Sequence, residues 1–199
     1  MRVNGKNLTT IWYDEKEDYV NIIDQTLLPH QLEIKSLKTL DDAVIAIKDM
    51  LVRGAPLIGV TAAYGMYLAS KKDTTNEYFI NAANLLKKAR PTAVNLTWAV
   101  DKIISTIKNI ENNKRSKFIL SLANKIREDD IITCSKIGDN GLLLLEEIYN
   151  KKQSRVNILT HCNAGWLATV DWGTALSPIF KANRKNIPIH VWVDETRPR

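Results

Sequence analysis

Cysteine is scarce in this sequence, and the scarcity limits the classes of protein to which the chain can belong. Among 199 residues there are two cysteines, Cys134 and Cys162. Two distant cysteines do not form the disulfide framework of a small secreted domain, so we expect reduced thiols and a cytoplasmic protein. No histidine or cysteine pair has the spacing of metal ligands, and we therefore expect no metal.

Long apolar runs are missing as well. No segment approaches the roughly 20 apolar residues that a membrane-spanning helix needs, and residues 1–6 lack the apolar run of a signal peptide. The glycine-rich motifs that bind nucleotide phosphates, Gly-x-x-x-x-Gly-Lys and Gly-x-Gly-x-x-Gly, do not occur either. We therefore expect neither a membrane partner nor a cofactor.

Positive charge is what the chain has in excess. Its 28 Lys and Arg residues outnumber 22 Asp and Glu residues, which gives a net charge of +6. The basic clusters fall where helices are expected to end, where cations interact favourably with the helix dipole. No nucleic-acid motif accompanies them, so we interpret them as a solvated surface and expect no nucleic-acid partner.

The first 36 residues predict short strands. Residues 10–13 and 19–23 flank the polar turn 14–18, which is typical of a β-hairpin, and residues 31–34 predict a third strand. Helical spacing then begins. Thr39 is the expected N-cap of a helix over residues 40–51, which Gly54 should end.

The following region predicts a helical domain. Residues 57–69 are apolar nearly all round, so the helix opened by Pro56 should be buried. Further helices are expected over about 76–89 and over 93–110, the latter capped by Thr92. Residues 116–126 and 131–149 predict two more, either separate or joined into one.

The chain changes character after residue 153. Residues 156–160 and 189–193 predict strands, and residues 174–183 predict the helix between them, which together make a parallel βαβ unit. The fold class is therefore α/β. Two parallel strands and one crossover helix do not bury a parallel sheet. We expect either strands from elsewhere to complete the sheet or the chain to be a fragment of a longer α/β protein.

Cys162 is the first candidate for chemistry. It follows the predicted strand 156–160 and precedes an apolar stretch, opened by Ala164 and Gly165, that can start a helix. Ligands bind at the carboxyl ends of parallel strands, and a helix N-terminus lowers the pKa of a thiol. The alternative is a small buried thiol at a tight turn. His161 should point to the opposite face and be packed.

Two arginines lie at predicted helix breaks. Arg53 and Arg90 each come just ahead of a new helix N-terminus, an arrangement that binds phosphate. The alternative is that each arginine simply caps the preceding helix. Two such breaks together with Cys162 favour a phosphorylated small-molecule substrate. Asp194 and Glu195 follow the last strand, and they either face the same cleft as Cys162 or lie in a solvated turn.

Five strings follow one another along the chain: Met-Leu-Val-Arg-Gly-Ala-Pro-Leu-Ile-Gly (50–59), Arg-Pro-Thr-Ala-Val-Asn-Leu (90–96), Thr-His-Cys-Asn-Ala-Gly (160–165), Gly-Thr-Ala-Leu (173–176) and Val-Asp-Glu-Thr-Arg-Pro-Arg (193–199). In this order they resemble those of the methylthioribose-1-phosphate isomerase family. That family is related to ribose-1,5-bisphosphate isomerase and to the alpha, beta and delta regulatory subunits of translation initiation factor 2B. The resemblance implies a hairpin plus helical domain over residues 1–150 and the first βαβ unit of a truncated Rossmann-like domain over residues 151–199.

The resemblance also implies an activity, the conversion of 5-methylthioribose 1-phosphate to 5-methylthioribulose 1-phosphate in methionine salvage. In this reading Cys162 is the catalytic proton donor or acceptor. The residues implied to bind the sugar phosphate are Arg53, Gly54, Ala55, Arg90, Asn163, Ala164 and Gly165.

Members of the family continue well past the Asp-Glu-Thr-Arg-Pro string, and the catalytic aspartate lies in that later part. The chain therefore resembles the N-terminal portion of the isomerase, which we expect to be inactive alone. The implied partners are a second copy of the chain, as a homodimer, or a complementing C-terminal fragment. The alternative is a non-catalytic assembly protein that resembles an initiation factor 2B subunit.

Overall fold

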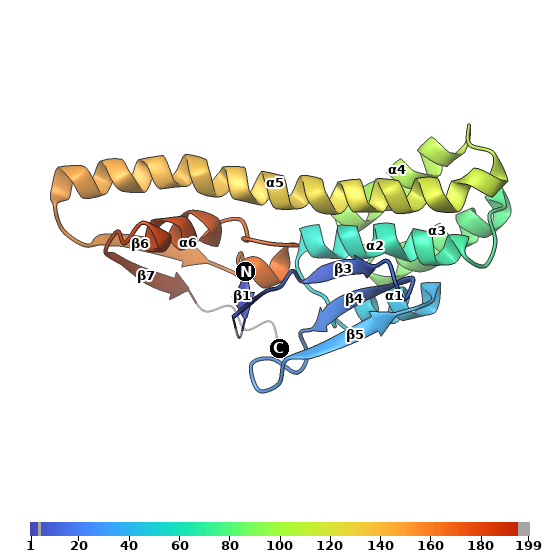
Figure 1. Ribbon diagram of the computed structural model, residues 1–199, viewed down its shortest axis with the longest axis horizontal. Helices are drawn as coiled ribbons and strands as arrows, with labels where there is room; N and C mark the ends of the chain where they lie inside the picture. Colours follow the sequence, from blue (N-terminus) through green and yellow to red (C-terminus); the bar gives the residue numbers. More distant parts are fainter. Residues whose placement is uncertain (4, 195–199) are drawn as a thin grey trace.

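A computed structural model of the chain, which describes residues 1–3 and 5–194, contains small sheets and α-helices gathered along one very long helix (Figure 1). Glu195 and the rest of the C-terminal string lie outside the described residues. The elements are β1 (Arg2–Val3), β2 (Lys6–Asn7), β3 (Ile11–Asp14), β4 (Tyr19–Asp24), β5 (Glu33–Leu37), α1 (Leu40–Lys48), α2 (Ala55–Ser70), α3 (Asn76–Ala89), α4 (Val94–Ile107), α5 (Asn112–Lys152), β6 (Val156–His161), the 3₁₀ helix η1 (Trp166–Ala168), α6 (Leu176–Arg184) and β7 (Ile189–Asp194).

The predicted hairpin is present. Strands β3 and β4 pair antiparallel from Ile11 opposite Ile22 to Asp14 opposite Tyr19. The third strand exists but lies at 33–37 instead of 31–34, because β5 pairs with β4 from residue 20 through residue 24 and this pairing sets its extent. The two-residue strands β1 and β2 were not predicted.

Helix α1 begins where its cap predicts. The Thr39 side chain accepts from the Asp42 N–H at 3.2 Å, and the Asp42 carboxylate accepts from the Thr39 N–H at 2.9 Å, which is a capping box. The helix ends at Lys48, earlier than predicted. The chain turns away so that the carbonyl of Leu51 can accept a hydrogen bond from the N–H of Gln25, at 2.9 Å.

Helix α2 is the centre of the larger core. Every residue from 57 to 70 is buried, as the run of apolar residues predicts, and α2 contacts α1, α3, α4 and α5. Helix α4 begins at Val94 with Ala93 as its N-cap and no side-chain cap, so the prediction that Thr92 caps it is wrong. The two helices predicted after residue 112 are joined into one, α5.

Helix α5 connects two hydrophobic clusters. Its 41 residues span about 60 Å, and Figure 1 shows it running along the whole molecule, over the helices at one end and over β6, α6 and β7 at the other. Its first half contributes Ile119, Ala123 and Ile126 to the larger cluster. Its second half contributes Leu142 to a smaller one, which α6 and the start of β6 complete.

Strands β6 and β7 pair in parallel, as predicted, from Val156 opposite Ile189 to His161 opposite Asp194. Three apolar side chains of this pair remain exposed. Leu159, Trp192 and Val193 are 69%, 60% and 66% exposed. No helix in the described part of the chain combines the length and apolar character that crossing a bilayer requires.

Candidate functional site

The turn before α2 lies directly against the end of the loop that carries Cys162. Gly54 is the N-cap of α2 and has φ +89, a conformation that L side chains rarely adopt. A Cβ placed on Gly54 would be 2.4 Å from both the Cα and the carbonyl oxygen of Ala168, in η1. The structure thus brings two of the predicted regions, residues 53–55 and the loop 162–168, into contact.

Helices α2 and α4 begin close together. A Cβ on Gly59, one turn into α2, would lie 3.0 Å from the carbonyl oxygen of Asn95, in the first turn of α4. Neither helix has a side-chain cap or an acidic residue in its first turn. Their first N–H groups are therefore without side-chain partners, and such helix starts attract anions.

Each of these helix starts is preceded by an arginine. Arg53 and Arg90 are both partly exposed. Within the described residues neither guanidinium makes an ion pair, and neither bonds a carbonyl of the helix before it. Arg90 is the C-cap residue of α3, as the alternative predicts, but in the described structure its side chain does not bond that helix. Both guanidiniums therefore remain available to an anion.

Cys162 is exposed and lies at the carboxyl end of β6 with φ +68. The prediction of a helix directly after it is wrong. In the described structure only the three-residue 3₁₀ helix η1 forms there, because the carbonyls of residues 167 and 169 bond to Gln25 and Thr10 instead of continuing a helix. Cys162 therefore has no helix N-terminus beside it, and its exposure also excludes the alternative of a buried thiol.

The neighbours of Cys162 in the substrate-binding prediction are placed differently from one another. Asn163 is exposed, beside the thiol in sequence, whereas Gly165 is buried. The carbonyl of Ala164 accepts from the N–H of Thr174 at 2.9 Å. Of these three residues, only Asn163 presents a polar side chain to solvent.

His161 is exposed, which makes the prediction of a packed side chain wrong. Its Nδ1 lies 3.5 Å from Oδ2 of Asp194, at the matching end of β7. Asp194 thus lies at the same end of the sheet as Cys162, and its side chain is exposed. Within the described ranges 1–3 and 5–194, no group of three or more His, Cys, Asp or Glu side chains could hold a metal ion.

The Cys162 loop is fastened to the N-terminal half by hydrogen bonds. The Thr10 hydroxyl donates to the carbonyl of Thr169 at 2.6 Å, and the Gln25 amide donates to the carbonyl of Leu167 at 2.7 Å. On either side of the thiol, the Thr160 hydroxyl and the Trp166 indole N–H are buried without partners in the described structure. Unpaired buried polar groups are costly, and they are often retained where a ligand binds.

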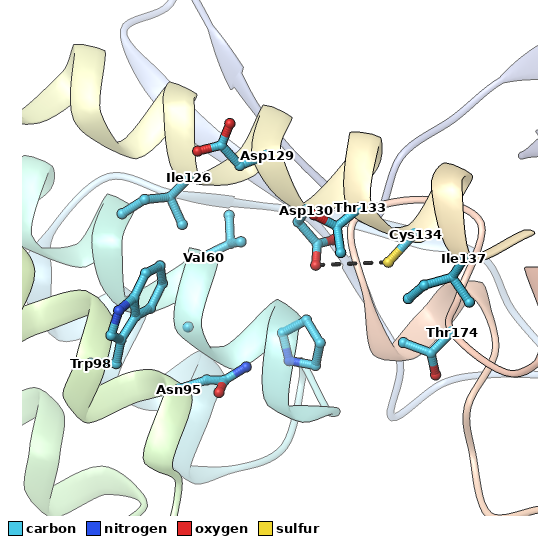
Figure 2. Close-up of a pocket in the computed structure, with 12 residues that line it drawn as sticks. Val60, Asn95, Trp98, Ile126, Asp129, Asp130, Thr133, Cys134, Ile137 and Thr174 are labelled. Atoms are coloured by element: carbon cyan, nitrogen blue, oxygen red, sulfur yellow. Dashed lines mark hydrogen bonds between the residues drawn. The ribbon is translucent and has the colours of Figure 1, made fainter. Parts of the chain in front are cut away.

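Sequence reasoning missed a pocket of about 300 Å³ on the inner side of α5 (Figure 2). Asp130 and Cys134 line it from α5, Trp98 from α4 and Thr174 from the loop before α6. Burial raises the pKa of the Asp130 carboxyl. Burial, with the nearby Asp130 charge, raises the pKa of Cys134 to about 11. The available signal was spacing, since Asp130 lies four residues from both Ile126 and Cys134 and so shares their buried face.

Comparisons with known proteins agree on one family. The Initiation factor 2 subunit family matches residues 51–199. Methylthioribose-1-phosphate isomerase from a strain of Escherichia coli is 51% identical over 201 residues, covering 100% of this chain and 54% of the relative. The enzyme of the same name from Methylorubrum extorquens is 49% identical, with coverage of 100% and 54%. The chain thus spans about half the length of the curated relatives it matches.

Two solved structures are similar to the described fold. The crystal structure of 5-methylthioribose 1-phosphate isomerase from Pyrococcus horikoshii OT3 has a TM-score of 0.83 and 35% identity, covering 97% of this chain and 54% of that one. The delta subunit of translation initiation factor eIF-2B from A. fulgidus has a TM-score of 0.80 and 34% identity, covering 96% and 56%.

Proposed function

The chain belongs to the Initiation factor 2 subunit family, and from this premise we propose that it provides the sugar-phosphate half of a methylthioribose-1-phosphate isomerase site. The observation that carries the proposal is the contact between Gly54 and Ala168, which sets the start of α2 against the Cys162 loop. The reaction is the conversion of 5-methylthioribose 1-phosphate to its ketose, the activity named for relatives about half identical to this chain.

The phosphate binds at the adjacent starts of α2 and α4. The backbone at Gly54 and Ala55 binds it, because no side chain caps the start of α2. The guanidiniums of Arg53 and Arg90 neutralise its charge through charge-assisted hydrogen bonds. Asn163, with the backbone of Ala164 and Gly165, contacts the sugar.

Cys162 moves the proton in this proposal. Isomerisation of an aldose to a ketose transfers hydrogen between C2 and C1 of the opened sugar. The exposure of the Cys162 thiol at the carboxyl end of β6 supports this role. General acid–base catalysis needs two groups within hydrogen-bond reach. We assign the second to an aspartate of a C-terminal portion, which would also extend β6 and β7 into a Rossmann-like sheet.

The partner is therefore a complementing C-terminal portion, a second copy of the chain as a homodimer, or both, in the cytoplasm. A second candidate function is a non-catalytic assembly protein similar to an initiation factor 2B subunit. The exposed Leu159, Trp192 and Val193 favour it, since an uncovered strand pair invites association with another chain. The likeness to the A. fulgidus delta subunit also favours it.

Calorimetric titration with 5-methylthioribose 1-phosphate separates the two candidates. We expect the wild type to bind and Arg53→Ala to bind at least about tenfold more weakly, since a charge-assisted hydrogen bond is lost. Arg155→Ala is the matched control, because Arg155 is also an exposed arginine without an ion pair in the described structure. Absence of binding by the wild type would favour the assembly protein.

Testing the role of Cys162 requires a measurement of catalytic turnover. We would supply the C-terminal half of the Escherichia coli relative as a separate chain and measure ketose formation. Cys162→Ala should abolish the complemented activity, whereas Cys134→Ala, which removes the other cysteine, should retain most of it. Equal turnover by wild type and Cys162→Ala would remove Cys162 from the chemistry.

A further inference from the structure

A second groove, of about 620 Å³, lies away from the proposed sugar-phosphate site. Its walls come from four places in the sequence, namely the segment before β3, β3 itself, α5 and the C-terminal unit. The lining residues on which the inference depends are Thr9, Trp12, Arg127, Trp172 and Arg184. None of them belongs to the residues assigned above to the sugar phosphate, and the groove has the volume of a small-ligand site.

The groove carries an excess of positive charge. Arg127 is held in place, because its Nε donates to the carbonyl of Ile11 at 2.9 Å and its Nη2 to the Thr9 hydroxyl at 3.1 Å. Arg184 is exposed and makes no ion pair within the described part of the chain. The negative charge of Asp171 offsets only the positive charge of the amino terminus, with which its carboxylate pairs at 2.7 Å. Arg127 Nη1 also lies 3.8 Å from a carboxylate oxygen of Glu128, a residue that does not line the groove. The lining itself therefore holds two guanidiniums and no carboxylate that pairs with them.

Trp172 fixes the position of Arg184. The Arg184 Cζ lies 4.4 Å from the centroid of the Trp172 ring, a cation–π contact. The second cation on this ring, Lys181, already pairs with Asp139 at 2.5 Å. Trp172 itself has φ +70, a costly conformation for a bulky residue and one that proteins tend to keep where it serves a function.

Trp12 supplies a flat apolar surface in the same groove. It is half-buried in β3, so its backbone is fixed by the sheet while part of the indole remains open. A planar ring can stack on such a surface, and base–aromatic stacking is a general mode of recognising nucleotides. The groove thus combines one stacking surface with two guanidiniums.

We propose that this groove binds a nucleoside monophosphate, with its base on Trp12 and its phosphate between Arg127 and Arg184. The stacking selects for a ring, and the guanidiniums, with their fixed fork of donors, select for the phosphate. A free nucleoside has no phosphate for the guanidiniums, and inorganic phosphate has no ring to stack on Trp12. The site is distinct from the one in the proposed function, so each can fail without the other.

The test is calorimetry on the full chain with its native amino terminus. Guanosine 5′-monophosphate and uridine 5′-monophosphate are the probes, and guanosine and inorganic phosphate are the partial ligands. We expect at least one nucleotide to bind about tenfold or more tightly than either partial ligand. Absence of nucleotide binding, or inorganic phosphate binding as tightly as the nucleotide, would overturn the proposal.

Three variants locate the binding. Arg184→Ala changes an exposed side chain and should weaken nucleotide binding about tenfold, and Trp12→Leu should do so to a similar extent. Arg155→Ala removes an equal charge outside the groove and should leave nucleotide binding unchanged. Arg184→Ala should bind 5-methylthioribose 1-phosphate with the same affinity as the wild type. If Arg184→Ala leaves nucleotide binding intact, or if Arg155→Ala weakens it equally, this groove is not the nucleotide site.

Discussion

The carboxylate of Asp130 accepts a hydrogen bond from the backbone N–H of Val170 at 2.7 Å. This bond joins the middle of α5 to the loop that carries Cys162, between residues 40 positions apart. Val170 belongs to the larger hydrophobic cluster, so its N–H has no access to water if the carboxylate is removed. Asp130 therefore holds this loop against α5.

Removing this acceptor should destabilise the fold. We expect Asp130→Ala to lower the free energy of unfolding by about 1–3 kcal/mol, because the N–H of Val170 is left buried and unpaired. Asp130→Asn keeps an acceptor oxygen of the same shape and should cost less than half as much. Urea denaturation at pH 7, followed by circular dichroism, measures both variants. Equal losses in the two would show that the bond does not hold the loop.

The stability contributed by Asp130 should also depend on pH. Burial raises the pKa of its carboxyl above the ordinary value of 3.8. The folded state therefore binds this proton more tightly than the unfolded state does. The stability that comes from this tighter proton binding is fully present below pH 3.8 and is lost as the pH rises through the folded pKa. The hydrogen bond from the Val170 N–H is separate from it and remains at pH 7.

Asp130→Asn lacks this titration and is the reference for measuring it. The unfolding free energy of the wild type, relative to that of Asp130→Asn, should be highest near pH 4 and should fall toward pH 7. Urea denaturation of both proteins across this range provides the measurement. A difference that stays constant with pH would mean that the carboxyl titrates normally in the folded protein.

The two cysteines should differ sharply in reactivity. Cys162 is exposed, whereas Cys134 is 2% exposed and its pKa is raised to about 11, so the nucleophilic thiolate of Cys134 is scarce at neutral pH. We expect one thiol to react with a disulfide reagent in the native protein at pH 7.5 and two after unfolding. Cys162→Ala should abolish the native reaction and Cys134→Ala should leave it intact. Native labelling of both thiols would contradict the burial of Cys134.

Local signals predicted the parts of the fold that local chemistry determines. The capping box at Thr39 marked the start of α1, and the apolar run after Pro56 marked the buried helix α2. The contact that assembles the site could not be read from the sequence, because Gly54 and Ala168 meet only when the two halves of the chain pack. The sequence showed the glycine at the break but not its neighbour.

The wrong predictions arose where distant contacts outweighed local preference. An apolar stretch after Cys162 resembled a helix. Three carbonyls of residues 167–170 instead accept hydrogen bonds from Thr10 and Gln25, and the Val170 N–H donates to Asp130. Thr92 had the chemistry of an N-cap, but the helix starts one residue later, at Val94 after Ala93. The start of α4 is therefore left without a side-chain cap, and a helix start of this kind attracts an anion.

Gly54→Ala should be among the most damaging single substitutions in the chain. The added Cβ would lie 2.4 Å from backbone atoms of Ala168, and alanine would also have to adopt φ +89. Because the obstacle is backbone, the Cys162 loop must move away from α2. We expect a loss of at least about 3 kcal/mol in the free energy of unfolding, from strain and overpacking together. Sugar-phosphate binding should fall with it, even under conditions in which the variant remains folded.

Gly5→Ala is the control for a positive φ without a collision. Gly5 has φ +78, close to that of Gly54, but a Cβ placed there meets nothing within 4 Å. Its substitution should therefore cost only the positive-φ conformation, about 1–2 kcal/mol. Urea denaturation of the two variants side by side gives the difference, to which the contact with Ala168 and the ψ of +136 at Gly54 both contribute. If the two losses were equal, the start of α2 and the Cys162 loop would not be packed as described, and the proposed site would lose the contact that assembles it.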